Sequence, residues 1–334
     1  MPKTPRFTAW RWITGLALAA LVLSVGFVLV QFQRHPSLAP YQALVLPEAT
    51  APTGVRVRFG GVTTLVFDDG ETAWMTDGFF SRPGAWETFT GKIGPDPARI
   101  DQALKRLGVD RLAAVVPVHS HYDHAMDSPL VAQRTGALLV GSASTLNVGL
   151  GAGLPADRMR EVKPGDVVQL GKFSLRFIAS RHSPTPYSDG HSIEPIEAPI
   201  TPPARATAWR EGTVWSLLVT HADGGSWLVQ GSAGYVPGAL AGQKADVVFL
   251  GTGTLGRKDE AYRAAYWHET VQAVGAKRVI PVHWDNFWRP LDESLQAMPL
   301  LLDDFDVVMA DLSKRAARDG VSLKLPPLYV PFVP

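Results

Sequence analysis

The chain has 334 residues, of which 46% are hydrophobic and 19% are charged. This composition supports a buried core and excludes a disordered or collagen-like chain. The formal net charge is +1, but four basic residues and no acidic residue precede position 35, so the remainder carries 28 basic and 31 acidic side chains. Such a balance argues against a nucleic acid as partner. Because cysteine is absent, disulfides, thiolate metal sites and a cysteine nucleophile are excluded.

Residues 13–30 form an uncharged apolar run near the N-terminus. At about 1.5 Å per residue in a helix, this run crosses most of a hydrocarbon layer of about 30 Å. Three cations precede the run and Arg34 follows it, which predicts a cytoplasmic segment at 1–12, a membrane anchor at 13–30 and a periplasmic body. The alternative is a signal peptide cleaved after Ser24-Val25-Gly26, which leaves the body in the same compartment.

The segment 31–54 contains four prolines and shows no helical period. This pattern predicts an extended stalk between the anchor and the body. The body, residues 55–334, shows no internal boundary and is predicted to be a single domain.

Hydrophobic periodicity in the body predicts many short strands with helices between them. The first three strands are expected to be antiparallel, because Asp69-Gly70 is a strong hairpin turn. Strands are predicted at 55–59, 62–67, 72–77, 112–118, 137–140, 167–170, 173–179, 214–220, 226–229, 246–250 and 278–282, and helices at 97–107, 128–134, 260–274 and 292–302. This distribution favours two mixed sheets packed face to face with helices outside.

The predicted strand at 112–118 runs directly into a segment rich in metal-binding residue types. Three histidines and two aspartates fall within nine residues there: His119, His121, Asp123, His124 and Asp127. In extended chain, residues i and i+2 point the same way, so His119 and His121 can bind one ion, while Asp123 and His124 can bind a second. Imidazole and carboxylate ligands favour zinc. Asp127 also fits the N-cap of the following helix.

The sequence His-Ser-His-Tyr-Asp-His at 119–124 resembles the signature of the metallo-β-lactamase superfamily, and the resemblance extends from about residue 55 to 311. It implies an α+β fold, a four-layer αββα sandwich, here preceded by one N-terminal transmembrane helix. It also implies that one ion takes His119, His121 and His182, and the other takes Asp123, His124 and His283. Asp77 matches the first acidic position of the superfamily. It is expected to hydrogen-bond ligand side chains on the side that faces away from the metal.

One position departs from the pattern of the superfamily. Members with two metals often carry a bridging aspartate after a strand, where this chain has Ser232. A neutral hydroxyl is a weak zinc ligand, so a hydroxide would have to bridge the ions alone. Two Zn²⁺ per chain are expected, with a single ion as the alternative.

The resemblance implies hydrolysis by a metal-activated water, with Asp123 orienting that water and accepting its proton. Candidates for stabilising the departing oxyanion are Tyr187, His191 and Tyr235. The expected substrate is a small molecule with an ester, lactone or phosphodiester bond. Because the chain carries an apolar anchor, a lipid-derived substrate is plausible.

Two further features bear on the substrate. The insertion at 183–211 follows a predicted ligand, and long ordered loops at such places shape pockets or lids. Six aromatic residues surround the metal motifs in sequence, and they either line the cleft or belong to the core: Phe79, Phe80, Trp86, Trp284, Phe287 and Trp288.

The competing hypothesis is a non-catalytic protein, a membrane-tethered scaffold or sensor that binds zinc. Its support is the loss of the bridging carboxylate at Ser232. Because structural zinc sites are closed by four protein ligands and each predicted trio leaves a position open, we favour the enzyme. The sequence specifies no oligomeric state.

Overall fold

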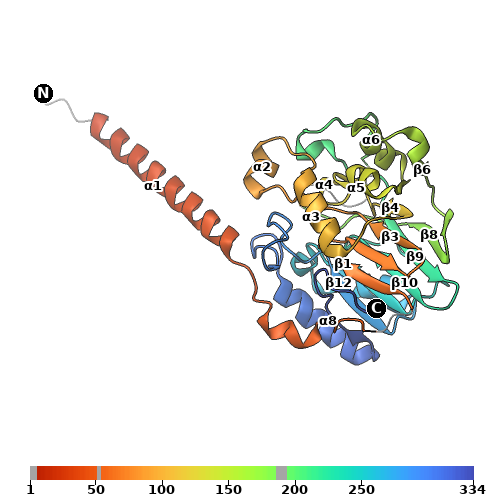
Figure 1. Ribbon diagram of the computed structural model, residues 1–334. Coiled ribbons are helices and arrows are strands. Elements are labelled where there is room, and N and C mark those ends of the chain that lie inside the picture. The colour runs from red at the N-terminus through yellow and green to blue at the C-terminus, as the bar shows by residue number, and fades with distance from the viewer. Residues whose placement is uncertain (1–5, 51–53, 186–193) are drawn as a thin grey trace, which may run out of the picture.

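The computed structural model describes residues 6–50, 54–185 and 194–334. Its N-terminal helix, α1 (Arg6–Gln33), projects away from the rest of the chain (Figure 1). The stretch Trp10–Gln33 is long and apolar enough to cross a membrane, and its most apolar part is not buried against any part of the body. A signal sequence near an N-terminus has the same length and composition, so the helix is a candidate span.

The stalk predicted at 31–54 is not extended in the structure. It contains a 3₁₀ helix, η1 (Ala39–Leu44), that packs against the body. The ring of Tyr41 meets the edge of Phe305 at 5.3 Å between centroids, and its hydroxyl donates to Asp306 Oδ1 at 2.6 Å. The prolines do interrupt helical periodicity as expected, but the apolar side chains between them gain buried area by docking.

The first sheet has six strands and combines both strand orientations. In spatial order they are β1 (Arg56–Phe59), β2 (Leu65–Asp68), β3 (Ala73–Thr76), β4 (Ala114–Val116), β5 (Leu138–Gly141) and β6 (Met159–Glu161). The pairs from β1 to β3 are antiparallel, as predicted, and those from β3 to β6 are parallel.

The second sheet has seven strands and is likewise mixed. Its order is β13 (Ser322–Leu323), β12 (Arg278–Val282), β11 (Val247–Gly251), β10 (Ser226–Gln230), β9 (Trp215–His221), β8 (Phe173–Ala179) and β7 (Val167–Leu170). The pairs from β7 to β10 are antiparallel and those from β10 to β13 are parallel. Consequently β8, β10 and β12 all point in one direction.

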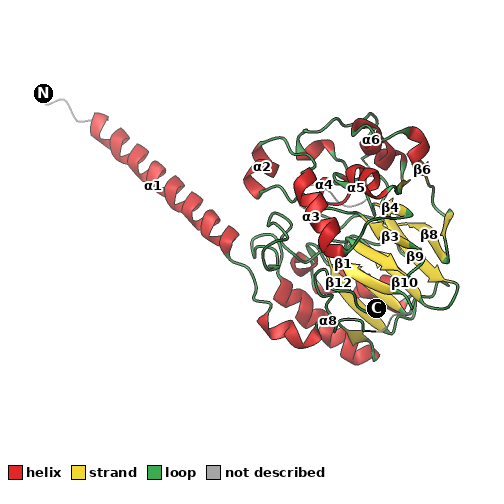
Figure 2. Cartoon of the chain, in the orientation of Figure 1, coloured by secondary structure: helices red, strands yellow, loops and turns green. Residues whose placement is uncertain are grey.

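The sheets stack face to face, with helices on both outer faces (Figure 2). The alternation of β11 shows how the layers form. Val247 and Phe249 belong to the core between the sheets, whereas Val248 and Leu250 pack in the cluster that contains the helices α7 and α8. Because successive side chains of a strand point to opposite faces, a strand buried on both faces reads as a continuous apolar run. The predicted αββα sandwich is confirmed.

The helices divide between the two outer faces. α3 (Pro97–Leu107) and α5 (Ser128–Thr135) cover the first sheet, and α7 (Glu260–Trp267) and α8 (Phe305–Asp319) cover the second. The remaining helices are α2 (Ala85–Thr90), α4 (Tyr122–Ala125) and α6 (Ala143–Gly151), and α7 continues into a π-helical turn at His268–Gln272.

The helix predicted at 292–302 is absent, because that segment forms turns and irregular structure. Pro299 interrupts its apolar pattern and cannot donate a helical hydrogen bond. The actual helix is α8, whose N-cap Asp304 accepts from the amides of Asp306 and Val307. Gly320 ends α8 with a left-handed conformation, φ 67°.

Candidate metal centre

Four strand ends meet at one edge of the sandwich and carry the candidate ligands. Asp77 directly follows β3, and His119 lies three residues beyond β4, both in the first sheet. His182 lies three residues beyond β8 and His283 directly follows β12, both in the second sheet. Because these four strands all end at the same edge, residues far apart in sequence come together.

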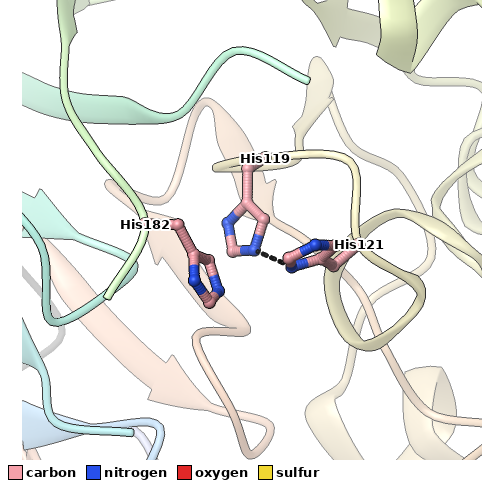
Figure 3. A group of neighbouring side chains, drawn as sticks. All are labelled: His119, His121 and His182. Atoms are coloured by element: carbon pink, nitrogen blue, oxygen red, sulfur yellow. Dashed lines mark hydrogen bonds between the residues drawn. The ribbon is translucent and has the colours of Figure 1, made fainter. Parts of the chain in front are cut away.

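The first group consists of His119, His121 and His182 (Figure 3). The Nε2 atom of His119 lies 3.1 Å from Nδ1 of His121. The ring of His182 lies 4.7 Å from that of His121, between centroids. The Nδ1 atom of His182 lies 2.8 Å from the carbonyl oxygen of Ser183, to which it donates, so its Nε2 is left to face the group.

The second group consists of Asp123, His124 and His283. The Nε2 atoms of His124 and His283 are 3.1 Å apart, and Oδ2 of Asp123 lies 3.3 Å from Nε2 of His283. The ring centroids of His119 and His124 are 3.9 Å apart, so the two groups adjoin. Each group takes two members from the segment after β4 and one member from the second sheet.

Asp77 is buried behind the second group and fixes the orientation of one member. Its Oδ2 lies 2.7 Å from Nδ1 of His124, and its Oδ1 accepts from the amide of Val118 at 2.9 Å. Although burial disfavours the charged ring, the Asp77 carboxylate raises the pKa of His124. Because Asp77 Oδ2 accepts the proton carried by Nδ1, the Nε2 atom of His124 is the one directed at the group.

Burial and mutual repulsion keep the imidazoles of the first group neutral. Burial lowers the pKa of His121 to about 4 and that of His182 to about 3, and it lowers the pKa of His119 well below its ordinary value. Burial acts in the opposite sense on Asp123, but His124 and His283 overcome it and hold the pKa of its carboxyl below the usual range. Neutral imidazole and ionised carboxylate are the forms that bind metal ions, so the donor set fits two ions.

A family model described as the beta-lactamase superfamily domain matches residues 85–284, a span of more than half the chain that includes all six candidate ligands. The chain belongs to the metallo-β-lactamase superfamily. Solved structures of this fold agree with the sandwich described above. A possible metal-dependent hydrolase of Veillonella parvula has a TM-score of 0.51 at 15% identity, with 84% of this chain and 99% of that chain covered.

Two further solved structures of hydrolases share this fold. Igni18, a metallo hydrolase of Ignicoccus hospitalis, has a TM-score of 0.50 at 12% identity, with 81% of this chain and 94% of that chain covered. An isothiocyanate hydrolase from Delia radicum gut bacteria has a TM-score of 0.50 at 15% identity, with 82% of this chain and 95% of that chain covered. The predicted class, a metal-dependent hydrolase of the metallo-β-lactamase superfamily, agrees with these neighbours.

Among curated proteins, a UPF0173 protein of Pyrococcus furiosus is 26% identical over 86 residues. The match covers 26% of this chain and spans 40% of the length of that relative.

Ser232, the position at which this superfamily member departs from the common pattern, lies beside the first group. Its hydroxyl accepts from the amide of Ser183 at 2.9 Å, next to His182. Its carbonyl oxygen accepts from the hydroxyl of Tyr266 at 3.2 Å. The structure thus places a neutral side chain, held by a backbone amide, at this position.

The three candidates for oxyanion stabilisation have different outcomes. Tyr187 and His191 lie outside the described residues. Tyr235 packs with the tyrosines of α7, its ring centroid 5.6 Å from that of Tyr262 and 6.2 Å from that of Tyr266. Those contacts give Tyr235 a packing role.

The aromatic residues near the motifs divide between core and surface. Phe79, Phe80, Trp284 and Trp288 are buried, whereas Trp86 is 82% exposed. The described part of the 183–211 insertion covers the metal loop: Ile196, Ile200 and Trp209 pack in one cluster with Val62, Phe79, Ala125 and Met126. The insertion therefore packs against the segment that carries the first group.

The sequence does not reveal the buried ion pair beneath the second group. Arg82 Nη2 lies 2.5 Å from Oδ2 of Asp285, and both side chains are inaccessible to solvent. Asp285 Oδ1 also accepts from the amide of Val62, whose carbonyl oxygen accepts from the amide of His283 at 2.7 Å. A charged residue two positions after a ligand is a weak signal, and its partner lies about two hundred residues away in sequence.

Backbone strain concentrates at the same place. Asp77 and His283 both adopt left-handed conformations, with φ values of 54° and 61°. Residues other than glycine seldom adopt such angles, and they occur most often where the surrounding structure fixes a functional group. Val62 and Arg82 share this conformation, with φ values of 51° and 44°, so the strained residues here include a candidate ligand, the carboxylate that orients another ligand, and the contacts beneath them.

Proposed function

We propose that the protein is a zinc-dependent hydrolase with two metal ions, which cleaves an ester, lactone or phosphodiester bond of a small molecule. The observation that carries this proposal is the pair of adjoining groups, each with three ligand atoms within 4.8 Å of one another. Three protein ligands leave a coordination position open for water or substrate, whereas structural zinc sites are closed by four. Imidazole and carboxylate ligands support zinc as the metal.

Bound zinc ions supply Lewis acidity and lower the pKa of a water molecule from about 16 to about 7. The chain itself supplies the orientation. Asp123 is buried beside His283, and its lowered pKa keeps the carboxylate ionised, so that it can accept a hydrogen bond from the attacking water and orient it. Asp77 keeps His124 in the required tautomer.

We also propose that α1 remains uncleaved and anchors the body to the membrane, with residues 1–12 in the cytoplasm and the body in the periplasm. The cations that precede the apolar stretch support this orientation. Detection of an intact N-terminus in membrane fractions tests this proposal.

The second candidate function is a non-catalytic scaffold or sensor that binds zinc. Ser232 favours it, since its hydroxyl carries no charge and already accepts a hydrogen bond from Ser183. One zinc ion per chain and no hydrolysis of any tested bond are the expected results for this candidate.

The deciding experiment uses the full-length protein, purified in detergent without added metal. Elemental analysis is expected to find about two zinc ions per chain, and a panel of chromogenic esters, lactones and phosphodiesters is expected to include a substrate. His121→Ala should remove the metal of the first group and abolish hydrolysis.

The matched control is His221→Ala. His221 pairs with Asp69 at 3.0 Å and packs on Phe173 at the beginning of β8, the opposite end of that strand from His182. This variant should keep both metals and hydrolysis. Undiminished hydrolysis in His121→Ala contradicts the proposal.

A further inference from the structure

The short helix α2 presents large aromatic side chains to solvent on the side of the body where α1 ends. Trp86 is 82% exposed and Phe89 is 62% exposed. The ring of Phe89 also contacts that of Trp288, with 5.2 Å between centroids. Figure 1 shows α2 on the side of the body from which α1 projects.

The end of α1 is fixed to the same tryptophan. Phe32 stacks on Trp288, with ring centroids 5.6 Å apart and an interplanar angle of 24°. One residue beyond α1, the carbonyl oxygen of Arg34 accepts from the amide of Leu300 at 2.7 Å. Trp288 therefore contacts both the C-terminal end of α1, through Phe32, and α2, through Phe89. These shared contacts fix the position of α2 relative to the end of α1.

Aromatic contacts continue from this point to the metal centre. Phe287 lies 5.0 Å from Trp288, and His283 lies 5.7 Å from Phe287, in each case between ring centroids. The candidate ligand His283 is thus two ring contacts away from the residue on which Phe32 and Phe89 pack. His283 therefore lies near the place where α1 joins the body.

We propose that Trp86 and Phe89, supported from beneath by the buried ring of Trp288, form an interfacial patch that rests in the headgroup region of the membrane that α1 spans. The patch would place access to the metal centre at the lipid surface, so the substrate class is an amphiphile that resides in the membrane. The inference rests on the proposed function, including the membrane span by α1. Tryptophan is favoured at the boundary between water and hydrocarbon, and phenylalanine occurs with it on the apolar face of helices that lie in that boundary.

Two features favour lipid over a second copy of the chain as the occupant. The exposed aromatic area consists chiefly of two side chains, whereas a stable dimer buries about 800 Å² per partner. Exposed cations also flank the patch, with Arg34 just after α1 and Lys92 just after α2. Cations at that level attract anionic headgroups.

The absence of cysteine permits a direct test. Trp86→Cys and, as the control, Lys277→Cys each receive one environment-sensitive fluorophore. Lys277 is 82% exposed and lies just before β12, at the opposite end of that strand from His283. The full-length proteins are placed in nanodiscs of phosphatidylcholine and phosphatidylglycerol, some of which carry a nitroxide on the lipid headgroup.

The nitroxide lipid is expected to quench the label at position 86 several-fold more than the label at 277, and aqueous iodide should show the reverse order. Equal quenching of the two labels by each agent would overturn the proposal. Protection of position 86 from both agents would also overturn it, because a protein partner would then cover α2.

A second measurement separates this proposal from the proposed function. The double variant Trp86→Ser, Phe89→Ser is compared with the parent on one scissile ester, presented either as a water-soluble compound or as a diacyl lipid in the same nanodisc. The ratio of lipid to soluble turnover should fall at least about tenfold, with metal content unchanged as the check on folding. An unchanged ratio would overturn the proposal that the patch contacts lipid. If the parent cleaves no compound of the hydrolysis panel, the proposed function is overturned instead. The quenching experiment alone then decides whether the patch contacts lipid.

Discussion

His124 connects a buried carboxylate to the second group of ligands: its Nδ1 lies 2.7 Å from Asp77 Oδ2, and its Nε2 lies 3.1 Å from His283 Nε2. The two nitrogens of one ring therefore have separate tasks, one as donor to the protein and the other as ligand. The Asp77 carboxylate accepts from the amide of Val118, and the Asp77 amide donates to the carbonyl oxygen of Val116, so the residue is fixed through both its side chain and its main chain.

Asp77→Asn removes the charge that keeps the proton on His124 Nδ1, while the amide oxygen can still accept from Val118. We expect metal affinity of the second group to fall about 10- to 100-fold, with the first group much less affected. Competition with a chelator, followed by elemental analysis of the full-length protein, measures both sites. Equal loss from the two groups would contradict the assignment of Asp77 to the second one.

Ser232→Asp introduces a carboxylate next to Ser183 and His182, where other members of the superfamily carry a bridging aspartate. An anion there should retain the hydrogen bond from the Ser183 amide and strengthen metal binding by electrostatic attraction. We expect the variant to keep more zinc than the parent during dialysis against a chelator. Ser232→Asn is the matched control, since it adds similar bulk without charge, and equal retention in both variants would remove the electrostatic explanation.

Arg82→Met leaves the Asp285 carboxylate buried without its cation, beneath the turn that carries His283. Breaking a buried ion pair in this way costs about 3–5 kcal/mol of unfolding free energy. Urea denaturation in detergent measures the loss. Arg134→Met is the control, because Arg134 pairs with Asp101 on the surface and such pairs contribute about 0–1 kcal/mol. Similar losses in the two variants would contradict the prediction.

Asp127 provides a pH-dependent prediction. Burial raises the pKa of its carboxyl from 3.8 to about 6, although the Ser81 hydroxyl and the amides of Ser81 and Phe80 donate to it. The folded state therefore binds this proton more tightly than the unfolded state. Its stabilising contribution is complete below about pH 4 and is lost as the pH rises through 6, by about 3 kcal/mol.

The measurement is the unfolding free energy of the full-length protein at pH 4 and at pH 7. The difference between these values should be smaller for Asp127→Asn than for the parent, because the variant has no proton to lose at that position. An identical pH dependence in both proteins would show that Asp127 does not titrate in this range.

Hydrophobic periodicity predicted two packed sheets, and the segment 119–124 predicted metal ligands, because that information is local, whereas the four-layer order and the candidate ligands His182 and His283 came from the resemblance to the superfamily. His119 to His124 lie within one short segment at a strand end, and His182 and His283 also follow apolar strands that are easily identified. Asp127 illustrates a limit. It occupies the N-cap position of α5 but makes no capping hydrogen bond, because its side chain reaches across to Phe80 and Ser81 instead.

The features that the sequence did not reveal depend on contacts between distant segments. Tyr41 packs on Phe305 although a proline-rich linker predicts extension, and Arg82 pairs with Asp285 across about two hundred residues. The helix predicted at 292–302 was wrong, because the apolar pattern before Pro299 is similar to that of an amphipathic helix, and α8 itself was not predicted. Periodicity describes one element at a time, and docking between elements lies outside what it can describe.

Each metal group draws two members from the segment after β4 and the third from the opposite sheet, His182 in one case and His283 in the other. An ion bound in either group would therefore cross-link the two halves of the sandwich at one edge. In a chain without cysteine, coordination would supply a constraint of the kind that disulfides provide in many secreted proteins. Metal binding would then stabilise the packing of the two sheets against each other, in addition to its role in hydrolysis.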